Sequence, residues 1–583
     1  MKITYLYSKK SLLLLTILLL LTSLQGTAGC LHSTETISSE SPFCVFNDYE
    51  GTSLNSAIEL GNQGARFVVP WYLIEPEEGV FTFDLLDNVV DQHYAEGIQL
   101  LLTIKCNSVW GTTSPGGPGT SASSFPKNMS QYERFIQTLT ERYLNKVSYW
   151  QIENEVFEPS KYWNGTKEEY IDLLHHASET IHSVDPLAIV VLQGFASSMF
   201  TLLNEGNETV QTFFEYILEE GQEYFDVVDF HQYWEPQDTY QSITLLKDTM
   251  QRFGYEKPLI CTEAGDLDIR LFQKHISNPD DPIPIIEKLL SIPVVQVKIY
   301  QILSDGKVTE EELINFASFL KNHWRTQPLL ECYQAENLVK RLGISLSQGV
   351  RQLYWLGMQE TTAASSVDWY WTMMPLITET GRKKPHYYTY KLVIEKLHDF
   401  TSVEELQIQP DIHVIRFNKT DQNPIYIAWS SSDNLLVDLS SLIPTPGALI
   451  THIITEIGQT DEDAQRSITP THQIKLTPTP IIIEHFEPQD IESSITGGLG
   501  CTYQVKNNGD RSAMAYWQCS YQSFFCMRSR GQKNGIIQIA ADSQELHWCA
   551  PFLGIGRITS SITDGHQGHT RQGILLFPFV LFI

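Results

Sequence analysis

The chain has 583 residues, and its 69 acidic and 40 basic side chains give a formal net charge of −29. Nucleic-acid binding depends on clustered Lys and Arg side chains, so this acidic balance argues against a nucleic-acid partner but not against a neutral sugar. The length exceeds what one hydrophobic core usually fills, so we expect two or more domains.

The first 30 residues have the pattern of an export signal. Three lysines precede an apolar run, Ser11 to Leu21, that is shorter than the roughly 20 residues needed to span a bilayer. The small residues before Cys30 are similar to a bacterial lipobox, although Thr27 stands where Leu is usual. We predict a signal peptide over residues 1–30, lipidation of Cys30 and a polar tether over residues 31–41. An uncleaved membrane anchor is the alternative.

Eight short apolar runs then alternate with helical stretches, which is the pattern of a (β/α)8 TIM barrel, an α/β fold. The predicted strands are Phe43–Phe46, Arg66–Pro70, Gln99–Ile104, Val147–Ile152, Ala188–Gln193, Phe225–Phe230, Pro258–Thr262 and Arg351–Leu356. We place the barrel at residues 42–398, with a mostly helical insertion at about residues 266–325.

Beyond residue 400 the apolar residues recur with a period of two, which predicts a small all-β sandwich domain over residues 400–488. The remaining segment, residues 489–583, holds four cysteines whose spacings fit no zinc signature. For that segment the sequence leaves two alternatives open: a disulfide-bearing appendage, or an extension that does not fold.

Two glutamates stand where predicted barrel strands end. Glu155 follows the run Trp150 to Asn154, and Glu263 closes the run Pro258 to Thr262 just before Gly265, which lets the chain turn. Barrel active sites are built at the carboxyl ends of the strands, so both carboxylates are candidates for catalysis.

Between these glutamates, the run Asp226 to Phe230 leads into His231 and Tyr233. Two strand-end carboxylates with a His/Tyr pair between them indicate a glycosidase, because cleavage of a glycosidic bond needs one group to protonate the departing oxygen and one to stabilise the anomeric carbon.

On these residues the chain resembles the large clan of retaining glycoside hydrolases built on a (β/α)8 barrel, and families 39, 42 and 5 in particular. That clan carries Asn-Glu after its fourth strand and a second Glu after its seventh, as Asn154-Glu155 and Glu263 do here. The stretch Arg66 to Trp71 is similar to the second strand of those families, and Ile74 to Phe83 to the loop that follows it. The resemblance spans about residues 42–488.

The resemblance implies that Glu155 is the acid/base and Glu263 the nucleophile of a double displacement. We expect Arg66 to keep Glu263 ionised by pairing with it, and Asn154 to donate a hydrogen bond to the sugar's 2-hydroxyl. Tyr233 would hydrogen-bond the nucleophile. His231 would line the same wall.

Four tryptophans near strand ends are candidates to stack on the apolar faces of sugar rings. They are Trp71, Trp110, Trp234 and Trp355, with Trp355 the preferred platform. Each candidate has a structural alternative: the tryptophans can simply pack, Arg66 can form an ion pair inside the barrel, and His231 can be a core histidine.

We therefore predict an exported, retaining glycosidase, cell-surface-anchored or secreted, that acts on β-linked oligo- or polysaccharides. It is expected to need no cofactor and no metal, and to contact membrane only through a lipid at Cys30. The alternatives are a carbohydrate-binding protein without turnover and a transglycosylase on the same scaffold. A metal-dependent hydrolase would need His/Asp ligands at a convincing spacing, which the sequence lacks. The sugar, the linkage, exo or endo action and the oligomeric state stay open.

Overall fold

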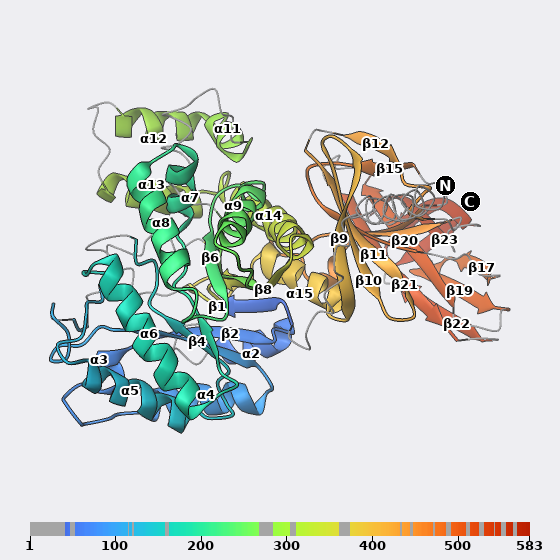
Figure 1. Ribbon diagram of the computed structural model, residues 1–583. Coiled ribbons are helices and arrows are strands. Elements are labelled where there is room, and N and C mark those ends of the chain that lie inside the picture. Colours follow the sequence, from blue (N-terminus) through green and yellow to red (C-terminus); the bar gives the residue numbers. More distant parts are fainter. Residues whose placement is uncertain are drawn as a thin grey trace, which may run out of the picture. The chain divides into compact units, whose positions relative to one another are not determined.

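A computed structural model gives the arrangement of the chain (Figure 1). The residues it describes are 41–46, 53–114, 116–118, 122–157, 162–266, 284–303, 310–360, 374–431, 434–443, 447–469, 473–485, 491–508, 513–523, 530–540, 543–549, 555–563 and 568–582. The predicted signal peptide, Cys30 and nearly all of the tether lie outside them. Among the described residues, none of the helices has the length and apolar character needed to cross a lipid bilayer.

The predicted TIM barrel is confirmed. Its eight strands are parallel and hydrogen-bonded in the order β5-β4-β3-β2-β1-β8-β7-β6. Two isolated parallel bridges, Val191 with Val227 and Phe195 with Phe230, join the β5 and β6 sides and close the circle. The strands are β1 (Phe43–Phe46), β2 (Gly64–Pro70), β3 (Gln99–Lys105), β4 (Tyr149–Ile152), β5 (Ile189–Val191), β6 (Val228–Gln232), β7 (Leu259–Ala264) and β8 (Val350–Leu356).

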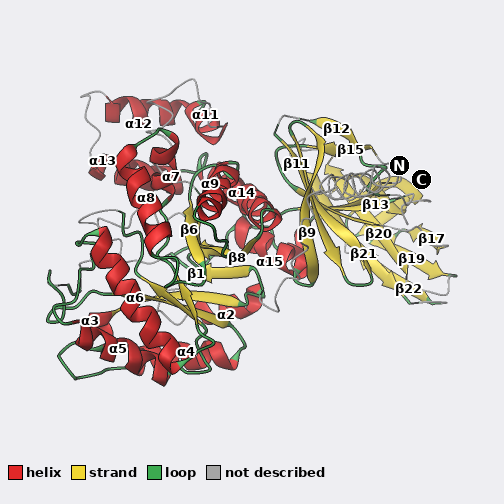
Figure 2. Ribbon diagram, in the orientation of Figure 1, coloured by secondary structure: helices red, strands yellow, loops and turns green. Residues whose placement is uncertain are grey.

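Amphipathic helices surround these strands (Figure 2). They are α2 (Ser53–Leu60), α3 (Trp71–Ile74), α4 (Asp84–Ala95), α5 (Met129–Arg142), α6 (Lys167–Val184), α7 (Ser197–Asn204), α8 (Glu208–Glu220), α9 (Asp238–Arg252), α14 (Gln327–Ser347) and α15 (Pro385–Leu397). In α5 the side chains of Tyr132, Phe135 and Leu139 recur at helical spacing and are buried. Helix α6 begins with a capping box between Thr166 and Glu169.

The structure describes three helices in the segment after β7 that was predicted as a mostly helical insertion. They are α11 (Pro284–Leu290), α12 (Pro293–Leu303) and α13 (Glu310–Asn322). These helices form a small core of their own with α14, in which Ile286, Leu289, Phe316 and Tyr333 are buried and Trp234 packs at the edge. The insertion is therefore a packed subdomain beside the loop after β6.

The all-β domain after the barrel is also confirmed. Its six-stranded sheet has the order β14-β13-β16-β11-β10-β9, and β12 pairs with β15. The strands are β9 (Phe400–Gln409), β10 (Ile412–Lys419), β11 (Gln422–Ser430), β12 (Leu435–Asp438), β13 (Ala448–His452), β14 (Arg466–Thr469), β15 (Gln473–Leu476) and β16 (Ile481–His485). The period-two apolar runs in the sequence predict six of these strands, at His413–Phe417, Ile425–Trp429, Leu435–Leu439, Ile450–Thr455, Gln473–Leu476 and Ile481–Glu484. Only β9 and β14, the two edges of the larger sheet, were not predicted. An edge strand has one neighbour and less burial, so its apolar alternation is weak.

In the tail the structure describes nine strands that bury a separate core including Tyr503, Val505 and Ile562. They are β17 (Ile491–Thr496), β18 (Gly498–Leu499), β19 (Cys501–Asn507), β20 (Ala513–Ser523), β21 (Arg530–Ile539), β22 (Gln544–Cys549), β23 (Ile555–Thr563), β24 (Gly568–Leu576) and β25 (Phe579–Phe582). Cys501 and Cys519 are free thiols whose sulfurs lie 3.7 Å apart.

Candidate active site

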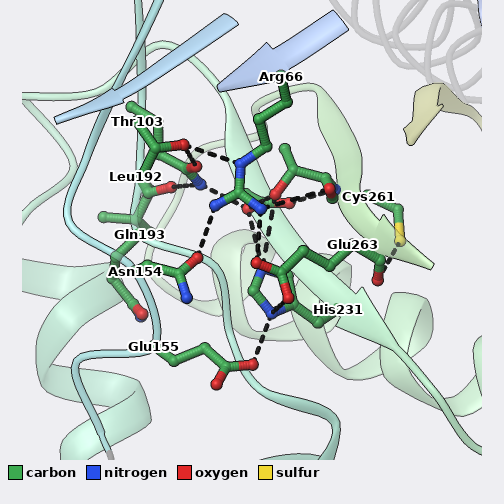
Figure 3. A network of polar contacts seen from close by, with 12 residues as sticks. Arg66, Thr103, Asn154, Glu155, Leu192, Gln193, His231, Cys261 and Glu263 are labelled. Atoms are coloured by element: carbon green, nitrogen blue, oxygen red, sulfur yellow. Dashed lines mark hydrogen bonds and ion pairs between the residues drawn. The ribbon is translucent and has the colours of Figure 1, made fainter. Parts of the chain in front are cut away.

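Glu155 and Glu263 meet at the carboxyl ends of β4 and β7. One oxygen of each carboxylate and one ring nitrogen of His231 all lie within 4.8 Å of one another. The two glutamates are only 7% and 6% exposed. Figure 3 shows both side chains directed toward the His231 ring. The structure thus brings together the two carboxylates that the strand-end pattern had singled out.

The backbone between β4 and Glu155 is unusual. Glu153 and Glu155 have φ angles of 68° and 46°, in the left-handed region that side chains other than glycine rarely adopt. Glu153 is fully buried, accepts a hydrogen bond of 2.5 Å from the Cys106 backbone and pairs with Lys105 at 2.9 Å. Glu153 therefore anchors the end of the strand below the site, and Glu155 is the acid that reaches the cluster.

Arg66 on β2 pairs with the candidate nucleophile. Its Nη1 lies 2.6 Å from Glu263 Oε1, and its Nη2 donates to Asn154 Oδ1 at 2.6 Å. Tyr233 donates its hydroxyl to the other Glu263 oxygen. Burial alone would raise the pKa of Glu263, but the positive charges of His231 and Arg66 and the Tyr233 hydrogen bond outweigh it, so this pKa is lowered from 4.5. Glu263 is held ionised, as a nucleophile must be.

His231 is fully buried and bridges two acids. Its Nδ1 lies 2.6 Å from Glu155 Oε1, and its Nε2 lies 3.4 Å from Asp229 Oδ2. Burial favours the neutral ring, but the charge of Glu263 and the contacts with Asp229 and Glu155 prevail and raise the pKa of His231 from 6.5 to about 10. His231 therefore joins Glu155 to Asp229, a contact that the sequence analysis did not predict.

Asp229 is the residue that the sequence analysis missed. It is fully buried in β6, two positions before His231, so both side chains lie on one face of the strand. The signal was present in the sequence, because an acid and a histidine at alternate positions of a buried strand need partners inside the barrel.

The predicted tryptophans divide into two kinds. Trp71 and Trp355 are fully buried, and their indole N–H groups donate to Glu75 Oε2 at 2.8 Å and Met374 O at 2.9 Å. Neither has an exposed face for a sugar ring, so the structure corrects their assignment from sugar platform to packing residue. Trp110 and Trp234 are half-buried, and a stacking role for them stays a prediction.

Two groups in the described part of the chain have a spacing compatible with metal ligands. Asp172, His175 and His176 form one on the outward side of α6. The other is the cluster of Glu155, His231 and Glu263 itself. In the second group the Arg66 cation already neutralises Glu263 and disfavours another cation. That cluster is therefore better suited to acid–base chemistry than to holding a metal ion.

Replacing Arg66 by Met is expected to lower the free energy of unfolding by about 3–5 kcal/mol, because it leaves the buried Glu263 charge without its cation. The measurement is urea denaturation, read at the transition of the barrel. Lys146→Met is the control, since it breaks an exposed 2.6 Å pair with Asp91 and should have little effect. Equal losses in both variants would contradict the structural importance of the Arg66 pair.

Comparison with known proteins adds to this geometry. A family model described as beta-galactosidase, of glycoside hydrolase family 42, matches residues 59–115, the segment that contains Arg66. No curated protein matches the chain in sequence.

Among solved structures, a family 39 glycoside hydrolase from Bacteroides cellulosilyticus WH2 is similar with a TM-score of 0.50 and 15% identity, over 77% of this chain and 82% of that one. A monomeric beta-xylosidase from Caulobacter crescentus CB15 is similar with a TM-score of 0.49 and 13% identity, over 77% of this chain and 96% of that one. A family 51 alpha-L-arabinofuranosidase from Bifidobacterium longum has a TM-score of 0.46 and 13% identity, over 77% of this chain and 96% of that one.

The likeness to the family 39 structure shows the fold. Together with the matching family model it supports a (β/α)8 glycosidase that resembles families 39 and 42.

Proposed function

We propose that the protein is a retaining glycoside hydrolase that cleaves β-glycosidic bonds by double displacement. One observation carries the proposal: an oxygen of Glu155 lies within 4.8 Å of an oxygen of Glu263. Retaining enzymes hold their two carboxyl groups about 5–5.5 Å apart, whereas inverting enzymes leave about 6.5–9.5 Å for a water molecule. A pair of oxygens this close resembles the shorter, retaining arrangement and so supports direct attack by Glu263 on the sugar.

In the first half of the reaction, Glu263 attacks the anomeric carbon while Glu155 delivers a proton to the departing oxygen. Arg66 can only donate hydrogen bonds, so its contact with Asn154 Oδ1 fixes that amide and leaves its NH2 group as the donor for the sugar's 2-hydroxyl. This bond strengthens as the 2-hydroxyl becomes more polar in the transition state.

In the second half, Glu155 removes a proton from water, and the water oxygen displaces Glu263 from the anomeric carbon. Tyr233 and Arg66 then receive the released carboxylate in the arrangement seen in the structure. The two inversions restore the original configuration. No step requires a cofactor.

The expected product is therefore the β-anomer, formed before mutarotation. A panel of nitrophenyl β-glycosides and β-glycans would identify the sugar, and proton NMR of the first product would identify the anomer. An α-anomer formed first would refute the retaining mechanism. Binding without hydrolysis would favour the carbohydrate-binding protein, and oligosaccharides longer than the substrate would favour the transglycosylase.

We also propose that the protein is exported and anchored by a lipid on Cys30, on the strength of the charged, apolar and small-residue segments that precede it. Mass spectrometry of the N-terminal peptide tests this proposal. A peptide that begins before Cys30 would contradict it.

A further inference from the structure

A one-way chain of hydrogen bonds runs inside the barrel from Arg66 to Asp229; Figure 3 labels its first members, Arg66 and Thr103. Arg66 Nε donates to Thr103 Oγ1 at 2.8 Å, and that hydroxyl donates to Gln151 Oε1 at 2.7 Å. Gln151 Nε2 donates to the Leu192 carbonyl at 3.2 Å and to Asp229 Oδ2 at 2.5 Å. Because a guanidinium has no acceptor, it sets the direction of every bond that follows.

Asp229 is the final acceptor of this chain. It also accepts from the Thr262 backbone N–H at 2.8 Å and from the Thr262 hydroxyl at 2.5 Å. With all these donors directed at it, the carboxylate has no need of a proton. Thr262 Oγ1 also lies 3.5 Å from His231 Nε2. Because the Thr262 hydroxyl proton is directed at Asp229, Oγ1 can only accept from Nε2, which therefore carries a proton and lies 3.4 Å from Asp229 Oδ2.

The other ring nitrogen of His231 is thereby assigned. With a proton fixed on Nε2, Nδ1 is the site that gains or loses a proton, and it lies 2.6 Å from Glu155 Oε1 and 3.5 Å from Glu263 Oε2. The backbone of Gly194 closes the far side of the ring, because a Cβ added there would lie 2.0 Å from Nε2. The ring therefore packs directly against the Gly194 backbone, at a place where a side chain would not fit.

We propose that Glu155 and His231 act as one acid–base unit that shares a single proton, with Asp229 as the positioning residue that fixes the ring. This inference rests on the proposed glycosidase function. In the free enzyme the shared proton is on His231 Nδ1, so the ring is an imidazolium ion. The shared proton reaches the departing oxygen by way of the Glu155 carboxylate.

The proton transfers balance in both half-reactions. When Glu263 bonds to the anomeric carbon and the glycosidic bond breaks, the departing oxygen takes a proton from Glu155, and Glu155 takes the Nδ1 proton. His231 is left neutral, with its Nε2 proton still in place. During hydrolysis of the intermediate, water gives its proton to Glu155 and through it to Nδ1, and Glu263 leaves as a carboxylate.

The charges around His231 link the release of its proton to the attack of Glu263 on the sugar. Glu155 faces the ring from the end of β4, Asp229 from β6 and Glu263 from β7, and the positive charge of Arg66 lies beyond Glu263. Burial opposes a charged ring, and the charge of Glu263 is the first of the influences that raise the pKa of His231. That charge disappears when Glu263 becomes an ester, so the proton is released as the new bond forms.

Asp229→Asn tests the assignment through a readout that a merely structural role would not change. We expect the alkaline limb of the pH profile of kcat/KM to move down by at least about one unit. We also expect an unactivated leaving group to lose about 10–100-fold in rate, while a dinitrophenyl leaving group, which needs no proton, loses far less. Asp91→Asn makes the same change at an exposed position of α4, so it is the matched control and should leave the pH profile in place. A profile unmoved in Asp229→Asn would overturn the proposal.

A second measurement does not depend on activity. NMR of the wild-type protein with 15N-labelled imidazoles, assigned with His231→Gln, should show the His231 ring protonated on both nitrogens between about pH 6 and 9. A neutral ring at pH 7 would overturn the proposal even if the protein hydrolyses glycosides. A doubly protonated ring without hydrolysis of any substrate would instead reject the proposed function.

Discussion

Glu263→Gln is expected to abolish hydrolysis, lowering kcat/KM by at least about 10⁴-fold for every substrate, because an amide oxygen cannot form the glycosyl intermediate. Gln keeps the volume of the side chain and can still accept from Tyr233, so the loss reports chemistry and not collapse of the site. Steady-state rates on a good nitrophenyl substrate measure it. Glu77→Gln, on an exposed loop, is the matched control and should retain wild-type rates. Hydrolysis by Glu263→Gln at more than about a hundredth of the wild-type rate would exclude Glu263 as the nucleophile.

The same variant has a consequence for stability at alkaline pH. The pKa of His231 is raised above its usual 6.5 in the folded protein, so its protonation stabilises the fold fully below about pH 6.5 and ceases to do so as the pH rises through about 10. Without the Glu263 charge this pKa falls, and the loss of stability should occur at lower pH. Unfolding temperatures between pH 6 and 10 for both proteins would show it, and superimposable curves would contradict it.

The helices and strands of the fold could be predicted from the sequence because buried elements show a regular spacing of apolar residues. All eight barrel strands were located, since each is buried on both faces and forms a continuous apolar run. The missed strands β9 and β14 lie at sheet edges, where neighbours are fewer and the apolar pattern weakens. The apolar pattern of a strand is therefore clearer the more deeply that strand is buried.

The site was predictable only in part, for a related reason. Strand-end position identified Glu155 and Glu263, because the barrel brings all such ends to one face. It did not distinguish an indole that faces the mouth from one that packs, so Trp71 and Trp355 were misassigned. It also did not reveal that Asp229 ends a hydrogen-bond chain, because that chain joins four strands far apart in the sequence.

Glu155→Ala should divide substrates by their leaving groups. Oligosaccharides and alkyl glycosides need a proton on the departing oxygen, so we expect kcat/KM for them to fall about 10²–10⁴-fold. A dinitrophenyl leaving group departs without that proton, so the glycosyl-enzyme should still form at close to the wild-type rate. The measurement is pre-steady-state release of dinitrophenol, in which a burst followed by slow turnover is the expected trace.

The slow turnover in Glu155→Ala has a specific cause, because water then lacks the base that activates it. Azide needs no base and can occupy the space left by the carboxylate, so it should restore turnover and yield a β-glycosyl azide. Glu155→Gln is the control of matched size, since it removes the acid but leaves no space for azide. Equal loss on activated and unactivated substrates, without azide rescue, would show that Glu155 supports the site and transfers no proton. In that case the short contact between Glu155 and His231 would be an ion pair that stabilises the barrel, and the acid would have to be sought elsewhere.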